Sequence, residues 1–442
     1  MSTQLLHQYL VSQRIHSSTA GEFLKVPVLY ASHNDFEVAQ TAPKVKIIFL
    51  GFDPAEGEPY GTWGSLVRGP DGNFYFAVGN HKSGSAADAF LLRYSPATQA
   101  CEVTLSTREV CGWYKDTGGD GKIHGSPDIA PNGDTWLLTF FGNYPKKSDW
   151  GIAYHGGWLI RHNVFTGHAE CMGQPVPDDS WPLHRWDWQH ERLYAIGEYG
   201  MFQDRASGDE QSQNAVYGWG KLLVYDTANR RLIRGQQPLP DDIHWQRRSL
   251  MLDAETGYVY GSEASATYRF IEYQAVTDTV RRMNAQLDAP LHSASRERTT
   301  DGAFLVFDYN GGFYKFFPAA DRVVKLGMNW LNGTEILQDI CISPDKRFAY
   351  YISASGLRPD PLPFESGMPV IQVDLRNHRK KVIAFLAPFI MQQHQFGLCA
   401  VYAIALSADG RSLVAIFNGD RDVPQYGQIA VVHIHIPESE RT

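Results

Sequence analysis

The sequence predicts an all-β protein, and within that class a seven-bladed β-propeller. The first observation behind this prediction is composition: aromatic residues make up 13% of the 442-residue chain, glycine occurs 40 times, and charged residues are 20%. Such a composition favours strands joined by many turns. The second is a strand and turn pattern that recurs seven times, and the third is that the two ends of the chain complement each other.

The N-terminal region precedes the repeats. Residues 3–14 place leucine, tyrosine and valine at helical spacing, which predicts a short helix in an N-terminal extension over residues 1–43. Lys44–Phe52, KVKIIFLGF, is a mostly apolar run of strand length. It predicts a buried strand that begins a propeller domain over residues 44–442.

Each repeat consists of a short strand, a polar turn, an aromatic-rich strand, and two further strands around a second turn. The spacing of the repeats is irregular, roughly 45 to 65 residues, as in propeller blades with variable loops. The first turns of the seven repeats fall at Asp71-Gly72, Asn132-Gly133, His190-Glu191, Thr256-Gly257, Asp301-Gly302, Asp345-Lys346 and Asp409-Gly410.

The seventh repeat lacks a fourth strand. Its third strand lies at about residues 427–436, and the sequence ends at Thr442. Lys44–Phe52, in turn, has no repeat of its own, so pairing the two strands removes an open sheet edge. We therefore expect the N-terminal strand to complete the last blade. The competing architectures are a large β-sandwich and a two-domain β protein.

Net charge and cysteine usage exclude several classes of protein. The formal charge of −8 argues against general nucleic-acid binding, which needs a basic face. The cysteines are odd in number and lack CxxC spacing, so we expect reduced thiols and no zinc ribbon. The N-terminus lacks the pattern of a signal peptide and no run approaches 18 apolar residues. We therefore expect a cytoplasmic monomer that binds no membrane, or a secreted protein if an export signal was removed.

The stretch Gly121–Pro145 is the most informative for function. Asn132-Gly133 between two apolar runs predicts a hairpin, because both residues tolerate the positive φ angles of a tight turn. The open end of that hairpin carries His124 on one strand and Asn143 and Tyr144 just past the other. An imidazole and a phenol brought together are able to act as a base and an acid.

The same end of the other repeats adds histidine and arginine. Loops that start the first strand and leave the second strand of each blade share one face of a propeller, around its central channel. An acidic protein that gathers His and Arg there is expected to bind an anion, because the guanidinium fork suits carboxylate or sulfate. The candidate substrate-binding residues are His184, Arg185, His244, Arg247, Arg248, His292, Arg296 and Asn143.

Other kinds of chemistry are poorly represented in the sequence. No G-x-S-x-G, phosphate loop or dinucleotide fingerprint occurs. Glu198 and Glu263 leave the second strands of the third and fourth repeats, so a glycoside hydrolase with paired acids stays an alternative. Tyr199, beside Glu198, occupies the place that Tyr144 has one repeat earlier, so either tyrosine is a candidate acid.

The GKIH sequence at Gly121–His124, followed some twenty residues on by a polar and aromatic strand end, resembles the β-propeller polysaccharide lyases that cleave ulvan. The resemblance implies that His124 removes the C5 proton of a uronate, that Tyr144 or Tyr199 protonates the leaving oxygen, and that arginines neutralise the carboxylate. Those arginines are Arg185, Arg247 or Arg248. Those enzymes tend to carry a second histidine where Asn143-Tyr144 stands here, and they are normally secreted.

The leading hypothesis is therefore a lyase that cleaves uronic-acid-containing anionic oligosaccharides or polysaccharides by β-elimination. The developing charge on the substrate needs a desolvated arginine or a divalent metal to stabilise it, so a bound metal is a possible cofactor. The alternative from another class is a non-catalytic propeller that binds an anionic glycan or a protein.

Overall fold

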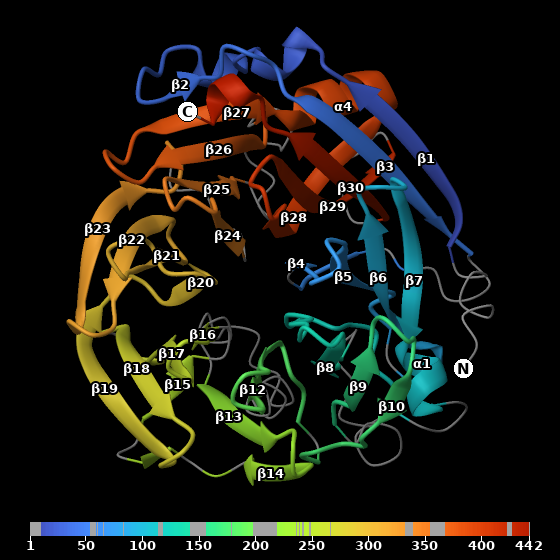
Figure 1. The fold of residues 1–442 in the computed structure, drawn as a ribbon, viewed down its shortest axis with the longest axis vertical. Coiled ribbons are helices and arrows are strands. Elements are labelled where there is room, and N and C mark those ends of the chain that lie inside the picture. Colours follow the sequence, from blue (N-terminus) through green and yellow to red (C-terminus); the bar gives the residue numbers. More distant parts are fainter. Residues whose placement is uncertain are drawn as a thin grey trace, which may run out of the picture. The chain divides into compact units, whose positions relative to one another are not determined.

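The structure is a computed structural model whose strands are coloured by sequence in Figure 1. It describes residues 10–53, 59, 61–64, 66–82, 84–113, 118–141, 156–177, 179–197, 219–235, 237, 239–240, 243–246, 249–265, 267–331, 339–353, 367–421 and 427–441. The chain divides into two compact units. The first consists of Met1–Leu10, Asp53–Pro59 and Trp63–Leu291, and the second of Val11–Phe52, Tyr60–Thr62 and His292–Thr442.

The described residues of the first unit form four antiparallel sheets in chain order, one for each of the first four predicted repeats. One sheet has β4 (Val67–Arg68), β5 (Phe74–Gly79), β6 (Ala89–Ser95) and β7 (Ala100–Ser106); the next has β8 (Asp134–Leu138), β9 (Leu159–Asn163) and β10 (Ala169–Cys171). The third has β11 (Leu183–Asp187), β12 (Arg192–Gly197), β13 (Trp219–Asp226) and β14 (Arg231–Arg234), and β15 (Trp245–Gln246) also pairs with β13. The fourth has β16 (Met251–Asp253), β17 (Tyr258–Ser262), β18 (Arg269–Gln274) and β19 (Thr279–Gln286).

The predicted hairpin of the second repeat is confirmed. Antiparallel bridges join Lys122 to Phe140 and Ile129 to Thr135, so the segment before β8 runs alongside it. At the turn, Gly133 adopts φ 88° and its amide donates to the Ala130 carbonyl over 2.9 Å. A residue with a Cβ resists that φ, which is why glycine follows the asparagine here.

The described residues of the first unit include one α-helix. Helix α1 (Thr107–Cys111) follows β7 directly, and the Ser106 hydroxyl accepts a hydrogen bond from the Glu109 amide as an N-cap. Gly112 ends the helix in the left-handed conformation. The 3-10 turn η5 (Gly84–Ala86) joins β5 to β6.

The second unit contains the remaining three sets of strands. The first set is β20 (Leu291–Ser295), β21 (Phe304–Asp308), β22 (Gly312–Phe317) and β23 (Arg322–Met328). The next is β24 (Asp339–Ile342), β25 (Phe348–Ile352), β26 (Pro369–Asp374) and β27 (Lys380–Phe385), with β2 (Glu37–Val38) parallel to β27. A short parallel pairing between β20 and β24 joins these two sets into one sheet. The last set is β28 (Phe396–Leu406), β29 (Ser412–Arg421) and β30 (Gln428–His435).

The N-terminal strand completes the last set, as predicted. Strand β3 (Lys44–Phe52) pairs antiparallel with β30, from Lys44 opposite His435 to Leu50 opposite Ile429. Its apolar side chains enter the core of the second unit, where Val45, Ile47 and Phe49 are buried. The strand therefore covers a sheet edge that β30 otherwise leaves open.

The predicted helix over residues 3–14 is wrong where the structure describes it. Leu10–Ser18 is strand β1, which lies next to β3, while residues 3–9 are outside the described residues. The strand packs closely because Gly51 has no side chain: a Cβ there would lie 2.3 Å from the Ser12 hydroxyl. Arg14 also lies over the Phe49 ring, 5.6 Å from its centroid. These tertiary contacts outweigh a weak local helix pattern.

In the described residues of the second unit, three 3-10 turns and one α-helix accompany the strands. The 3-10 turns η2 (Gly21–Leu24) and η3 (Val28–Tyr30) follow β1, and η9 (Glu438–Glu440) follows β30. Helix α4 (Leu386–His394) joins β27 to β28 and buries an apolar face. Within the described part of the chain, no helix is long and apolar enough to cross a membrane. The division into an extension over 1–43 and a propeller over 44–442 stays a prediction.

Candidate functional site

A histidine and a lysine both lie against one aromatic ring at the open end of the second-repeat hairpin. The ring belongs to Phe140. The His124 imidazole meets it edge-on with centroids 5.4 Å apart, and the Lys122 ammonium lies 5.2 Å from its centroid. Both side chains are more than nine-tenths buried. A titratable imidazole and a cation are thus held together by the bridge from Lys122 to Phe140.

The first repeat contributes a second aromatic wall. The Lys122 ammonium lies 4.8 Å from the centroid of the Trp63 ring, and that ring in turn lies 5.0 Å from the His81 ring. The close approach depends on glycine: a Cβ on Gly79 would lie 2.0 Å from the Gly121 carbonyl oxygen. Lys122 is therefore placed against two aromatic faces, a geometry in which an ammonium group makes cation–π contacts.

The third repeat contributes His184 on β11. Its ring lies against the backbone of Gly125, where a Cβ would come within 2.1 Å of His184 Nδ1. The Ser126 amide also donates to the His184 carbonyl over 3.0 Å. Gly125 follows His124 directly, so the structure brings these two predicted histidines to the same place. We call Trp63, His81, Lys122, His124, Phe140 and His184 the histidine cluster.

His184 is a neutral imidazole at ordinary pH. Burial lowers its pKa to about 4, an effect that the nearby Asp128 carboxylate opposes and Arg185 reinforces. Among the described residues, neither ring nitrogen has a hydrogen-bond partner. A buried polar group without a partner is costly. An unpartnered polar group beside other titratable side chains makes the histidine cluster a candidate ligand site.

Arg185, predicted to bind the substrate carboxylate, contacts a carboxylate of the protein itself. Its Nε donates to Asp128 Oδ2 over 2.9 Å, and the Trp186 amide donates to the same oxygen over 2.9 Å. The Ser126 hydroxyl binds the other oxygen of Asp128 over 3.0 Å. This network fastens β11 to the hairpin, so the structure gives Arg185 a role in positioning His184.

The fourth-repeat candidates have separate surroundings. The His244 carbonyl accepts from the Ala264 amide over 2.7 Å. Glu263, the glycoside hydrolase candidate, is buried and forms an ion pair with Arg282 at 2.8 Å. The Glu263 carboxylate is therefore already paired with an arginine of the protein itself.

The fifth-repeat candidates, His292 and Arg296, belong to the second unit. The His292 ring meets the Tyr309 ring edge-on with centroids 4.3 Å apart. Both candidates are partly exposed.

Several predicted residues lie outside the described residues. They are the two candidate acids, Tyr144 and Tyr199, together with Asn143, Glu198, Arg247 and Arg248.

Lys122 is the residue that the sequence-based reasoning missed. Its signal was available: it stands two positions before His124 in GKIH, within a glycine-rich run. The sequence leaves open whether a metal is bound; the described residues contain no cluster of three His, Cys, Asp or Glu that could hold an ion.

Comparison with known structures supports the fold class of this chain. No protein-family model matches the chain, and no curated protein matches it. An oligogalacturonate lyase from Vibrio parahaemolyticus is similar in structure, with a TM-score of 0.54 and 9% sequence identity over 98% of this chain and 99% of that one. The β-propeller domain of Cps50 (Swd1) from Myceliophteria thermophila gives a TM-score of 0.51 and 11% identity over 85% of this chain and 97% of that one. The chain thus has an all-β, propeller-like fold, the predicted class, and its described strands are consistent with seven blades.

Proposed function

We propose that the protein is a lyase that cleaves uronate-containing oligosaccharides by β-elimination at the histidine cluster. The similar structure of an oligogalacturonate lyase supports the substrate class, and short galacturonate oligomers are therefore the first substrates to test. Ulvan, named by the sequence resemblance, is the second.

The observation that carries the proposal is the pairing of a buried histidine with a buried lysine around Phe140. The hydrogen on C5 of a uronate is weakly acidic, because removing it places negative charge on carbon and the adjoining carboxylate. A fixed cation lowers the energy of that charge. Lys122 supplies the cation and His124 a base with an intrinsic pKa near neutrality.

The reaction balances without a redox partner. His124 takes the C5 proton, the electron pair forms the C4–C5 double bond, and the C4–oxygen bond breaks. The leaving oxygen receives a proton from Tyr144 or Tyr199. His184 is neutral beside Gly125 and is available to hydrogen-bond the sugar or its carboxylate. One substrate molecule gives two products, one of which carries the double bond.

The test is incubation with oligogalacturonate, ulvan, alginate and a glucuronan, followed by ultraviolet absorbance of the unsaturated uronate and mass spectrometry. We expect product from at least one polymer. His124→Ala should lower kcat by about 10²–10⁴-fold, the usual contribution of a general base. Circular dichroism of the variant checks that it is folded.

Lys122→Met tests the cation separately. Methionine keeps the unbranched stem between the two rings but removes the charge, so kcat/KM should fall by about 100-fold or more. Lys25→Met, at an exposed position, is the matched control and should change nothing. Full activity of His124→Ala would overturn the residue assignment alone. Absence of unsaturated product from every polymer would overturn the lyase, and binding without cleavage would favour the non-catalytic propeller.

A further inference from the structure

A cavity in the first unit lies away from the histidine cluster. It has a volume of about 510 Å³ and lies at the turn end of the second-repeat hairpin, where Ala130–Asp134 meets the turns after β11 and β13. None of the histidine-cluster residues lines it. A volume of this size falls in the range of small-molecule sites, roughly 300–1,000 Å³.

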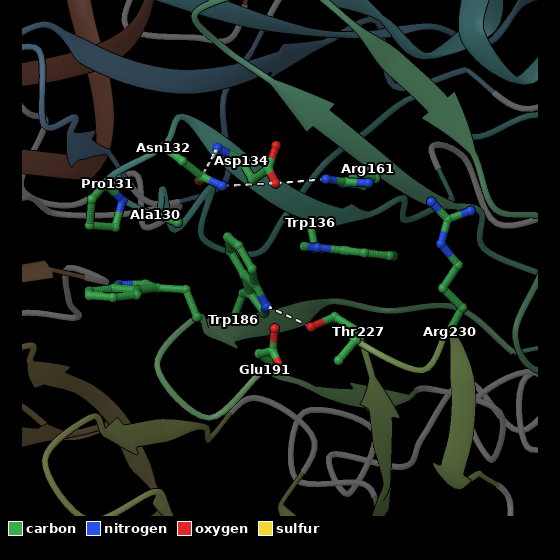
Figure 2. A pocket seen from close by; sticks show the side chains of 12 residues that line it. Ala130, Pro131, Asn132, Asp134, Trp136, Arg161, Trp186, Glu191, Thr227 and Arg230 are labelled. Atoms are coloured by element: carbon green, nitrogen blue, oxygen red, sulfur yellow. Dashed lines mark hydrogen bonds and ion pairs between the residues drawn. The ribbon is translucent and has the colours of Figure 1, made fainter.

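Three tryptophans line this cavity, which we call the tryptophan pocket. Trp136 and Trp186 are almost fully buried, whereas Trp188 is 38% exposed. The Trp186 indole donates to the Thr227 hydroxyl over 3.3 Å, as Figure 2 shows. Trp136 packs against the Tyr225 ring with centroids 5.8 Å apart. The walls are therefore held in place before any ligand binds, which reduces the entropic cost of binding.

The rim of the tryptophan pocket carries fixed polar groups. Arg161 forms an ion pair with Asp134 at 2.8 Å, and the Asn132 amide donates to the same carboxylate over 3.3 Å. The Arg161 guanidinium, with hydrogen bonds from asparagine side chains, holds the pKa of Asp134 below its usual range, although burial opposes the shift. The carboxylate thus stays an acceptor throughout the neutral range.

The charged groups at the rim disfavour binding of an anionic ligand. Both rim arginines are already paired with carboxylates, Arg161 with Asp134 and Arg230 with Glu170 at 2.9 Å. Glu191 adds a further negative charge to the lining. The pocket is thus balanced in charge, unlike the cation-bearing histidine cluster.

We propose that the tryptophan pocket binds a neutral pyranose of a glycan. A pyranose has an apolar face of C–H groups and a rim of hydroxyls. The first matches an indole face, and the second matches paired carboxylate and guanidinium groups that accept and donate hydrogen bonds. This site goes beyond the proposed lyase and does not rest on it: it holds a neutral unit of a glycan without reacting with it.

The experiment measures binding of galactotriose, cellotriose, maltotriose and mannotriose to the full chain. Tryptophan fluorescence titration gives the affinity, and saturation-transfer NMR identifies the sugar protons in contact. We expect at least one neutral trisaccharide to bind with a roughly millimolar dissociation constant. Trigalacturonate should bind the pocket more weakly than that sugar.

Two variants locate the binding. Trp188→Ala removes the exposed indole and should weaken binding at least about tenfold. Ala228→Trp fills the pocket from an exposed lining position and should do the same without deleting a native contact. Phe165→Ala removes a comparably exposed aromatic outside the lining, 45% exposed, and should leave binding unchanged, as should His124→Ala.

The proposal is overturned if none of the neutral trisaccharides binds, or if binding survives both Trp188→Ala and Ala228→Trp. Preference for trigalacturonate at this pocket would also overturn it. Loss of binding in His124→Ala would assign the signal to the histidine cluster instead. Because cleavage is not measured, failure of this test is independent of whether the chain is a lyase.

Discussion

Buried histidines make the stability of this protein sensitive to acid at the scale of single residues. His162 on β9 is fully buried, and its Nδ1 contacts the His168 carbonyl at 3.0 Å. Burial lowers its pKa to about 4, while the His168 carbonyl and the Asp134 charge oppose this shift and the His168 charge adds to it. His184 has the same lowered pKa of about 4. Both side chains resist protonation in the folded state.

The sign of the pH effect follows from proton binding. Between about pH 4 and the ordinary histidine pKa of 6.5, the unfolded chain binds a proton at His162 that the folded chain does not. Acid therefore destabilises the folded state. For one such histidine, the free energy of unfolding should fall by about 2 kcal/mol between about pH 7 and about pH 5.

His162→Asn tests this prediction, because its amide is able to donate where Nδ1 does but does not titrate. Chemical denaturation of both proteins at the two pH values should show that acid lowers the free energy of unfolding less in the variant than in the unsubstituted protein. The comparison with the unsubstituted protein is needed because burial raises the pKa of Asp88 to about 6. As the pH falls, the folded chain binds a proton at Asp88 before the unfolded chain does, so this residue makes acid stabilise the folded state and offsets part of the histidine effect. An equal acid loss in both proteins would contradict the prediction.

At the scale of single residues, the sequence predicted which histidines approach the hairpin but not what surrounds them. His124 and His184 were both named from their positions before first strands. The close approach of the His184 ring to the backbone beside His124 depends on Gly125, and the Asp128 network that fixes Arg185 links positions 57 residues apart. Periodicity carries no information on such long-range side-chain partners, so Arg185 was assigned to the substrate.

At the scale of elements, helix α1 and strand β10 bring two thiols together. Cys111 ends α1 and Cys171 ends β10, and both are free cysteines. Burial raises the pKa of the Cys111 thiol, and the hydrogen bond that this thiol donates to Cys171 raises it further. Accepting that hydrogen bond lowers the pKa of Cys171 to about 7. Spacing in the sequence suggested no pairing between them, since Cys111 ends a helix after the first repeat and Cys171 ends a strand of the second.

We expect a mild thiol oxidant such as diamide to join Cys111 and Cys171. The Cys171 thiolate attacks the azo nitrogen of diamide, and the Cys111 sulfur then displaces the hydrazine and forms the disulfide. The rate should rise as pH passes through about 7, because the thiolate is the nucleophile. Peptide mapping under non-reducing conditions identifies the bond. Cys111→Ser should abolish it, whereas Cys101→Ser should not; a different linkage, or none, would contradict the prediction.

Repeats and turns were the most predictable part of the structure at this scale. Asn132-Gly133 predicted its hairpin because tight-turn chemistry is local. Residues 10–14 were mispredicted as helix because their conformation depends on strand β3, which lies far along the chain, and on the missing Cβ of Gly51. Sequence patterns therefore predicted the structure correctly where neighbouring residues determine it, and predicted it wrongly where pairing with a distant strand determines it.

At the scale of the whole molecule, the second unit is built from both ends of the chain. Strand β3 fills the edge beside β30, and Val45, Ile47 and Phe49 enter a core shared with β28 and β29. Burying an aliphatic or aromatic side chain contributes about 1.5–3 kcal/mol. Three such residues, together with the backbone pairing, approach the total stability of a typical domain, about 5–15 kcal/mol.

Removal of residues 1–52 should therefore unfold the second unit, whereas removal of residues 1–18, which deletes β1 alone, should leave it folded with a lower melting temperature. Hydrogen exchange over β28–β30 and thermal denaturation by circular dichroism measure the two outcomes. A peptide of residues 40–53 added to the longer truncation should restore protection, because an open edge accepts a strand through main-chain hydrogen bonds. The same peptide with Ile47→Asp, which places a charge in the core, should fail to do so. Full protection of β30 without β3 would show that the N-terminal strand is dispensable and that the sheet is stable with that edge open.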